Sequence, residues 1–66
     1  MMTKKDIARN IIYWYKVAKQ SAKEGCEKAS LIEIGTGLAY LAIAYRECMI
    51  KEEEYNLLRN AYDRLW

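Results

Sequence analysis

Hydrophobic residues recur three and four positions apart along most of the chain, which is the spacing of one face of an α-helix. The first such stripe consists of Ile7, Ile11, Trp14, Tyr15, Ala18 and Ala22. Thr3, followed three residues later by Asp6, matches a helix start, and Gly25 suits the left-handed residue that ends many helices. The pattern therefore predicts a helix over about residues 4–24.

Two further helices are predicted, over about residues 30–50 and 52–65. Ser30 and Glu33 have the spacing of a capping box, and the short segment GCEKA before them implies an antiparallel hairpin with the first helix. Three glutamates at 52–54 favour the positive end of a helix dipole. The stripe of this third helix is Tyr55, Leu58, Tyr62 and Leu65. No Gly or Pro marks the break before it, so one long bent helix is the alternative.

Residues 34–45, IGTGLAYLAIAY, are the longest stretch without a charge. A phosphate-binding loop needs a strand before the glycines and a Lys-Ser/Thr or helix start after them, and neither is present. On a helix, the residues expected to pack against other helices are Ile34, Gly35, Leu38, Ala39, Leu41, Ala42 and Tyr45. Gly35 and Ala39 are four apart and predict a close helix approach, whereas Gly37 and Ala44 fall on the far side.

The fold class predicted is all-α, a small three-helix protein built from a helical hairpin plus a third helix, with residues 1–66 as one domain. A helix that is apolar nearly all round is buried nearly all round. The first and third helices can each cover one side of the second, and each has a stripe of its own to bury. We therefore expect a homodimer with the second helix central. A monomer with an exposed partner groove and a higher oligomer are the alternatives.

Composition excludes several classes of site. There is no His, and Cys26 and Cys48 are too far apart for a CxxC zinc motif, so we expect reduced thiols, no metal and no cofactor. Without His, a Ser/His or Cys/His nucleophile is impossible, and no enzyme is expected. The uncharged stretch of 12 residues is shorter than the roughly 20 that span a membrane. The N-terminal MMTKKD lacks a signal-peptide core, so a cytoplasmic protein without a membrane partner is expected.

Charge is distributed unevenly although the net value is only +2. Residues 1–30 carry seven basic against three acidic residues, and residues 31–66 carry four against six. The predicted partner-binding residues are the basic side of the first helix with its exposed tyrosine, and the end of the third helix: Lys5, Arg9, Tyr13, Lys16, Lys23, Tyr62 and Trp66. An ordinary solvated face is the alternative. A phosphate backbone is a further one, which the acidic start of the third helix, KEEEY, disfavours.

Arg46 lies among apolar positions of the second helix, where a buried guanidinium needs a partner. Glu33, Asp63 or a carboxylate of another chain would make a structural salt bridge. An anionic ligand or a partner protein would make Arg46 an anchor instead.

These observations favour a non-enzymatic, stoichiometric protein-binding module, acting as an inhibitor, adaptor or regulator of another protein. An acidic protein would suit the basic face of the first helix. From size alone, an accessory protein of a phage or mobile element is the favoured instance. The first alternative is a small nucleic-acid-binding protein that uses the basic face of its first helix. The second is sequestration of a small anionic ligand at a dimer interface.

Overall fold

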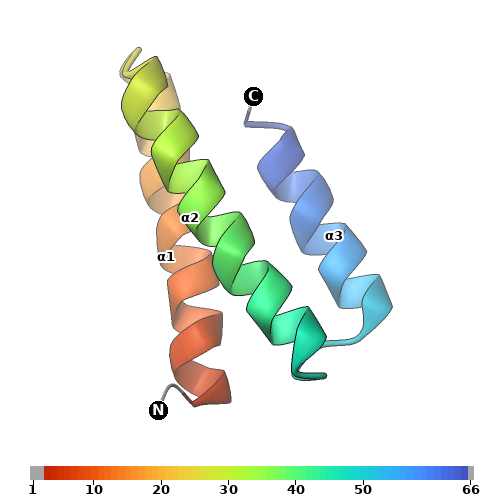
Figure 1. Ribbon diagram of the computed structural model, residues 1–66. Helices are drawn as coiled ribbons and strands as arrows, with labels where there is room; N and C mark the ends of the chain where they lie inside the picture. Colours follow the sequence, from red (N-terminus) through yellow and green to blue (C-terminus); the bar gives the residue numbers. More distant parts are fainter. Residues whose placement is uncertain (1–2, 66) are drawn as a thin grey trace.

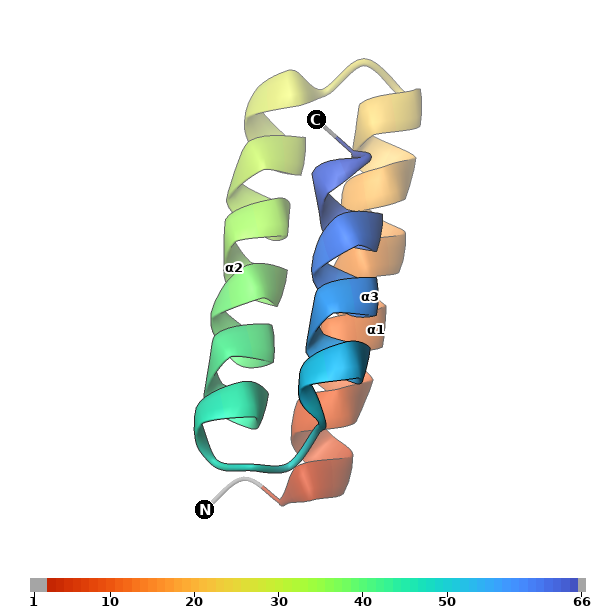
Figure 2. The same ribbon diagram turned by 90° about the vertical axis from the view of Figure 1, so that its right-hand side faces the viewer.

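The computed structural model describes residues 3–65, which form three α-helices: α1 (Lys4–Lys23), α2 (Glu27–Arg46) and α3 (Glu52–Asp63) (Figure 1). The all-α class and the three helices are as predicted. α1 and α2 form an antiparallel hairpin and pack along their length, whereas α3 turns back beside α2 and packs mainly on it (Figure 2). The helix in the middle of the sequence therefore joins the other two.

The start and the end of α1 follow from local sequence, as predicted. The Asp6 backbone N–H donates to Thr3 Oγ1 (3.2 Å), and the Thr3 N–H donates to Asp6 Oδ2 (3.3 Å), which completes a capping box. Gly25 has φ +82°, and the N–H groups of Gly25 and Cys26 return to carbonyls of the last turn of α1. The left-handed glycine thus reverses the chain directly into α2.

The predicted start of the second helix at Ser30 is wrong, because α2 begins at Glu27 with Cys26 as its N-cap. Ser30 is buried inside the helix, and its hydroxyl donates to the carbonyl of Ala18 in α1 (3.2 Å). Glu33 accepts a hydrogen bond from the Ser21 hydroxyl (2.6 Å). The turn at Gly25 is so tight that both polar side chains already face α1, and they join the hairpin instead of capping a helix.

The second helix also ends earlier than predicted, at Arg46 and not near residue 50. Cys48 takes the left-handed conformation with φ 58°. The Cys48 N–H bonds to the carbonyl of Tyr45 (3.0 Å), and the Met49 N–H bonds to that of Ala44 (2.8 Å). This pair of bonds is a Schellman motif, which usually has glycine at the left-handed position. A cysteine at that position therefore separates α2 from α3, and the one-bent-helix alternative is excluded.

The core contains residues of all three helices: Ile7, Ile11, Ala18, Ile34, Leu41, Ala44 and Tyr62. Tyr62 was predicted at an exposed end, and this prediction is wrong because its side chain is fully buried. Its hydroxyl donates to the carbonyl of Ile11 in α1, and its ring meets the edge of Tyr15 at 5.5 Å. Burial raises the pKa of Tyr62 to about 12, so the phenol keeps its donor proton well above neutral pH.

The close approach on α2 occurs at Gly37 and not at Gly35. A Cβ added at Gly37 would overlap the hydroxyl and ring of Tyr62, whereas one added at Gly35 would meet nothing within 4 Å. Ala44, also predicted on the far side, is buried in the same core. The prediction was wrong because α3 returns along the Gly37 side of α2, and the sequence pattern alone does not fix that side.

Within a single chain the second helix is covered on only one side, which agrees with the expectation that the other two helices cannot hide all of its apolar residues. Ile34 and Leu41 are buried in the chain's own core and Leu38 is half-buried, but Gly35, Ala39, Ala42 and Tyr45 are exposed. We call the exposed apolar side of this helix the outer face of α2; it consists of Leu31, Ile32, Gly35, Ala39 and Ala42. This face has no partner within the described chain, and the homodimer stays a prediction.

Arg46 is exposed at the end of α2, so the expectation of a buried guanidinium is wrong. One of the carboxylates proposed for it, Glu33, bonds instead to Ser21. The other, Asp63, lies near Arg59. The pKa of Arg59 is raised mainly by its hydrogen bond from Nη1 to the Tyr55 hydroxyl (3.0 Å), and the nearby charge of Asp63 adds to this effect. Arg46 therefore needs no internal partner.

Candidate protein-binding groove

An open groove separates α1 from α3 because both helices pack against α2 and make few contacts with each other. Two hollows follow one another along it and share Ile11, Ile12 and Leu58 in their walls, so they form one surface. We call this surface the α1–α3 groove. Its floor is the core below, and its two walls are the helices that the fold leaves apart.

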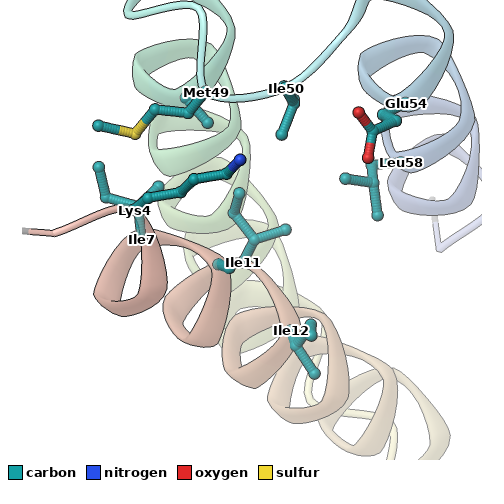
Figure 3. Close-up of a pocket in the computed structure, with 10 residues that line it drawn as sticks. Lys4, Ile7, Ile11, Ile12, Met49, Ile50, Glu54 and Leu58 are labelled. Carbon is teal, nitrogen blue, oxygen red and sulfur yellow. The ribbon is translucent and has the colours of Figure 1, made fainter.

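The first hollow lies where the α2–α3 connection passes the start of α1. It has a volume of about 180 Å³, and Figure 3 shows Leu58 and Glu54 of α3 across it from Ile11 and Ile12 of α1. Ile50 of the connection lies at its edge, and the side chain of Lys4 extends toward it. Except for Lys4 and Glu54, the side chains that line it are apolar.

The second hollow lies further along α1 and α3 and is larger, with a volume of about 530 Å³. Its walls carry an exposed large hydrophobic side chain on each helix: Ile12 is 53 % exposed on α1 and Leu57 is 72 % exposed on α3. Aliphatic side chains at this exposure gain from being covered by another surface. Because these two side chains line the same hollow from two helices, this hollow is the best candidate for contact with another molecule.

The groove has a positively charged rim. Lys16 and Lys19 of α1 and Arg64, which directly follows α3, line the larger hollow, which has no carboxylate in its walls. Lys4 and Glu54 line the smaller one and balance each other. All three cations of the larger hollow are exposed, so they are free to meet carboxylates of a partner.

The structure brings only part of the predicted partner-binding set to this groove. Lys16 lines it, and Lys5, Arg9 and Lys23 are exposed elsewhere on α1. Tyr13 is exposed away from the groove, with its ring edge-on to Trp14 at 5.2 Å. Trp66 lies outside the described residues. The basic side of α1 therefore adjoins a groove whose apolar side chains were not predicted.

Sequence reasoning missed Ile12 and Leu57, although a signal for both is present. Each belongs to a doublet, Ile11-Ile12 and Leu57-Leu58, in which one member lies on the apolar stripe. Consecutive helical residues differ by about 100° in direction, so the second member of such a doublet must leave the core face. An apolar residue next to a complete apolar stripe is not needed for the core. Such a residue is thus a candidate for contact with another molecule.

Two other kinds of site, a metal site and a membrane-spanning helix, find no support among the residues that the structure describes. Residues 3–65 contain no group of three Cys, Asp or Glu side chains placed to hold a metal ion. Among the same residues, no helix combines the length and hydrophobicity needed to cross a membrane. Both cysteines are exposed and free.

Comparison with protein-family models, with curated proteins and with solved structures gave no match to this chain. The α1–α3 groove itself is therefore the basis for proposing a function.

Proposed function

We propose that this chain is a non-enzymatic protein-binding module that holds a partner protein in the α1–α3 groove, as an inhibitor, adaptor or regulator. The observation that supports the proposal is the pair Ile12 and Leu57, exposed on facing walls of one groove. Protein interfaces are built around such an apolar centre with a polar rim, and here Lys16, Lys19 and Arg64 provide the rim.

A nucleic-acid role for the basic side of α1 is less well supported. Ile12 lies between Arg9 and Lys16 on this helix and is half exposed. An aliphatic side chain in that position gains nothing from a phosphate backbone, whereas a protein surface would bury it. The acidic turn Glu52–Glu54 at the start of α3 would also repel phosphates.

The proposal is tested by selecting ligands from a library of random displayed peptides on the immobilised chain, with no assumption about their sequence. Selected peptides are then compared on two variants, Leu57→Glu in the groove and Ile32→Glu on the outer face of α2. Both residues are exposed leucine or isoleucine side chains on helices, at 72 % and 71 %, so the substitutions are matched. Circular dichroism checks that both variants keep their helices.

We expect most selected peptides to lose about tenfold or more in affinity on Leu57→Glu and to bind Ile32→Glu unchanged. Peptides that depend on Ile32 and not on Leu57 would move the binding surface to α2. Selection of none, or of peptides indifferent to Leu57, would contradict the proposed function.

A further inference from the structure

The α1–α3 groove has the shape that one more helix would fill. α1 and α3 both pack against α2 and make few contacts with each other, and the hollows between them lie where a small helical bundle would place a fourth helix. A helix seated between two others packs its side chains into the spaces between theirs at an axis separation of about 8–10 Å. An added helix would contact both walls at once.

Two other common modes of peptide recognition fit the groove poorly. Addition of a β-strand needs an open sheet edge, and residues 3–65 contain no strand. Recognition of a proline-rich segment uses aromatic-lined grooves. Here the exposed contact side chains are the aliphatic Ile12 and Leu57. The aromatic residues of the lining are less accessible, since Tyr15 is half-buried and Tyr62 is buried. Aliphatic walls suit the apolar stripe of an amphipathic helix.

The length of the groove sets the length of such a helix. Its walls extend along α1 from Lys4 to Lys19. At about 1.5 Å per residue this distance is roughly 22 Å, or about four helical turns of a partner. Four apolar side chains, spaced by three and four residues, would therefore lie along most of the groove.

The charged side chains that line the groove favour one kind of amphipathic helix over others. The lining side chains include the cations Lys4, Lys16, Lys19 and Arg64 and a single carboxylate, Glu54. A basic or neutral helix would leave the cations of the larger hollow without partners, whereas glutamates or aspartates beside the apolar stripe would pair with them. A second copy seated by its own groove would place like charges against each other, so self-association is disfavoured at this surface.

We infer that the α1–α3 groove recognises one acidic amphipathic α-helix of a partner protein, about four turns long. Its apolar stripe would lie between Ile12 and Leu57, and its carboxylates would meet Lys16, Lys19 and Arg64. This inference rests on the proposed function, since it specifies what kind of protein segment the groove binds.

The test uses synthetic peptides of about 15 residues with the full chain, by fluorescence anisotropy. The first peptide carries leucines at positions i, i+4, i+7 and i+11, flanked by glutamates and otherwise alanine. The second replaces every glutamate with lysine, and the third has the composition of the first in an order without an apolar stripe. The variants are Leu57→Glu, the matched control Ile32→Glu, and the charge reversal Lys16→Glu with Arg64→Glu.

We expect the acidic peptide to bind about tenfold or more tightly than the lysine peptide, because several weak rim pairs act together. The shuffled peptide should bind no better than the lysine peptide. Leu57→Glu should weaken the acidic peptide by about tenfold or more, and Ile32→Glu should leave it unchanged. The charge reversal should invert the preference between the acidic and lysine peptides, and added salt should reduce it.

Equal binding of the acidic and lysine peptides, or of the ordered and shuffled ones, would overturn the inference. If library peptides still depend on Leu57 in that case, the proposed function stands and only the acidic helix is wrong. Preferential binding to vesicles of phosphatidylserine and phosphatidylcholine, lost in Leu57→Glu, would overturn it in favour of a lipid surface.

Discussion

At the scale of single residues, the contact between Gly37 and Tyr62 decides how α3 is held. Tyr62 crosses the face of α2 where Gly37 has no side chain, and its hydroxyl reaches the carbonyl of Ile11 on α1. One side chain of α3 thereby touches both other helices. The groove depends on this contact, because Leu57 lies on the helix that Tyr62 fixes and Arg64 directly follows that helix.

Alanine substitutions at the two glycines of α2 should change stability in opposite directions. Gly37→Ala would displace Tyr62 and its hydrogen bond, and we expect a loss of about 2–4 kcal/mol in the free energy of unfolding. In the single chain Gly35→Ala adds a methyl group in open space on a helix. At chain concentrations too low for a dimer we therefore expect a gain of about 0.5–1 kcal/mol. Urea denaturation followed by circular dichroism measures both.

The Gly35→Ala variant is also the control for the general effect of replacing a helical glycine. If both substitutions stabilised the chain, the Tyr62 contact would not govern the position of α3. A loss confined to Gly37→Ala, together with weaker peptide binding, would connect this contact to the groove.

The sequence does not distinguish these two glycines. Both lie in one helical stretch two residues apart, and Gly35 has the small neighbour, Ala39, that suggests close packing. What separates them is the side of α2 along which α3 returns, and the connection from 47 to 51 sets that side. Positions within a helix follow from periodicity, but the contacts of a glycine follow from the path of another element.

At the scale of elements, the helices themselves were predictable and their ends were only partly so. Thr3 with Asp6 and the left-handed Gly25 are local signals, and both act as predicted. Ser30 and Glu33 have the pattern of a cap but bond to α1, because a tertiary contact competes for the same side chains. No local sequence signal predicts the end of α2, because Cys48 occupies the left-handed position where glycine is usual.

Replacing Cys48 should show how much this end of α2 is strained. A left-handed residue with a Cβ costs about 1–2 kcal/mol, and glycine removes that cost while adding roughly 0.5–1 kcal/mol of chain entropy. We expect Cys48→Gly to raise the free energy of unfolding by up to about 1 kcal/mol. Cys48→Val, with a branched Cβ, should lower it by about 1 kcal/mol or more.

Because Cys48 is exposed, neither variant removes a core contact, and thermal unfolding reports the backbone effect directly. A stability loss in Cys48→Gly would mean that its side chain contributes more than its conformation costs. Equal behaviour of the glycine and valine variants would show that this position relaxes away from the left-handed region.

At the scale of the whole molecule, two separate apolar surfaces stay uncovered within the described residues. One is the α1–α3 groove, and the other is the outer face of α2. The sequence indicated a surplus of apolar surface correctly. It assigned only part of the surplus correctly. Gly35, Ala39 and Ala42 are exposed as expected, but Ile34 and Leu41 are covered by the chain itself, and the exposed Ile12 and Leu57 were missed.

The two surfaces share no residue, so self-association at one is compatible with partner binding at the other. The outer face of α2 has small residues at Gly35, Ala39 and Ala42, which would let a second copy of α2 approach closely. We expect light scattering over a concentration series to show a reversible dimer. Ala39→Glu should raise its dissociation constant by about tenfold or more, since it would bury a charge at the centre of the contact.

Leu57→Glu is the matched test of which surface carries the dimer. If the outer face of α2 is the interface, this groove variant keeps the dimer and loses only peptide binding, while Ala39→Glu does the reverse. Dissociation caused by Leu57→Glu would mean that two copies cover each other's grooves, and the groove would then not be available to another protein. A monomer at every concentration would leave both faces open, and a partner large enough to contact α2 as well as the groove would have to be sought.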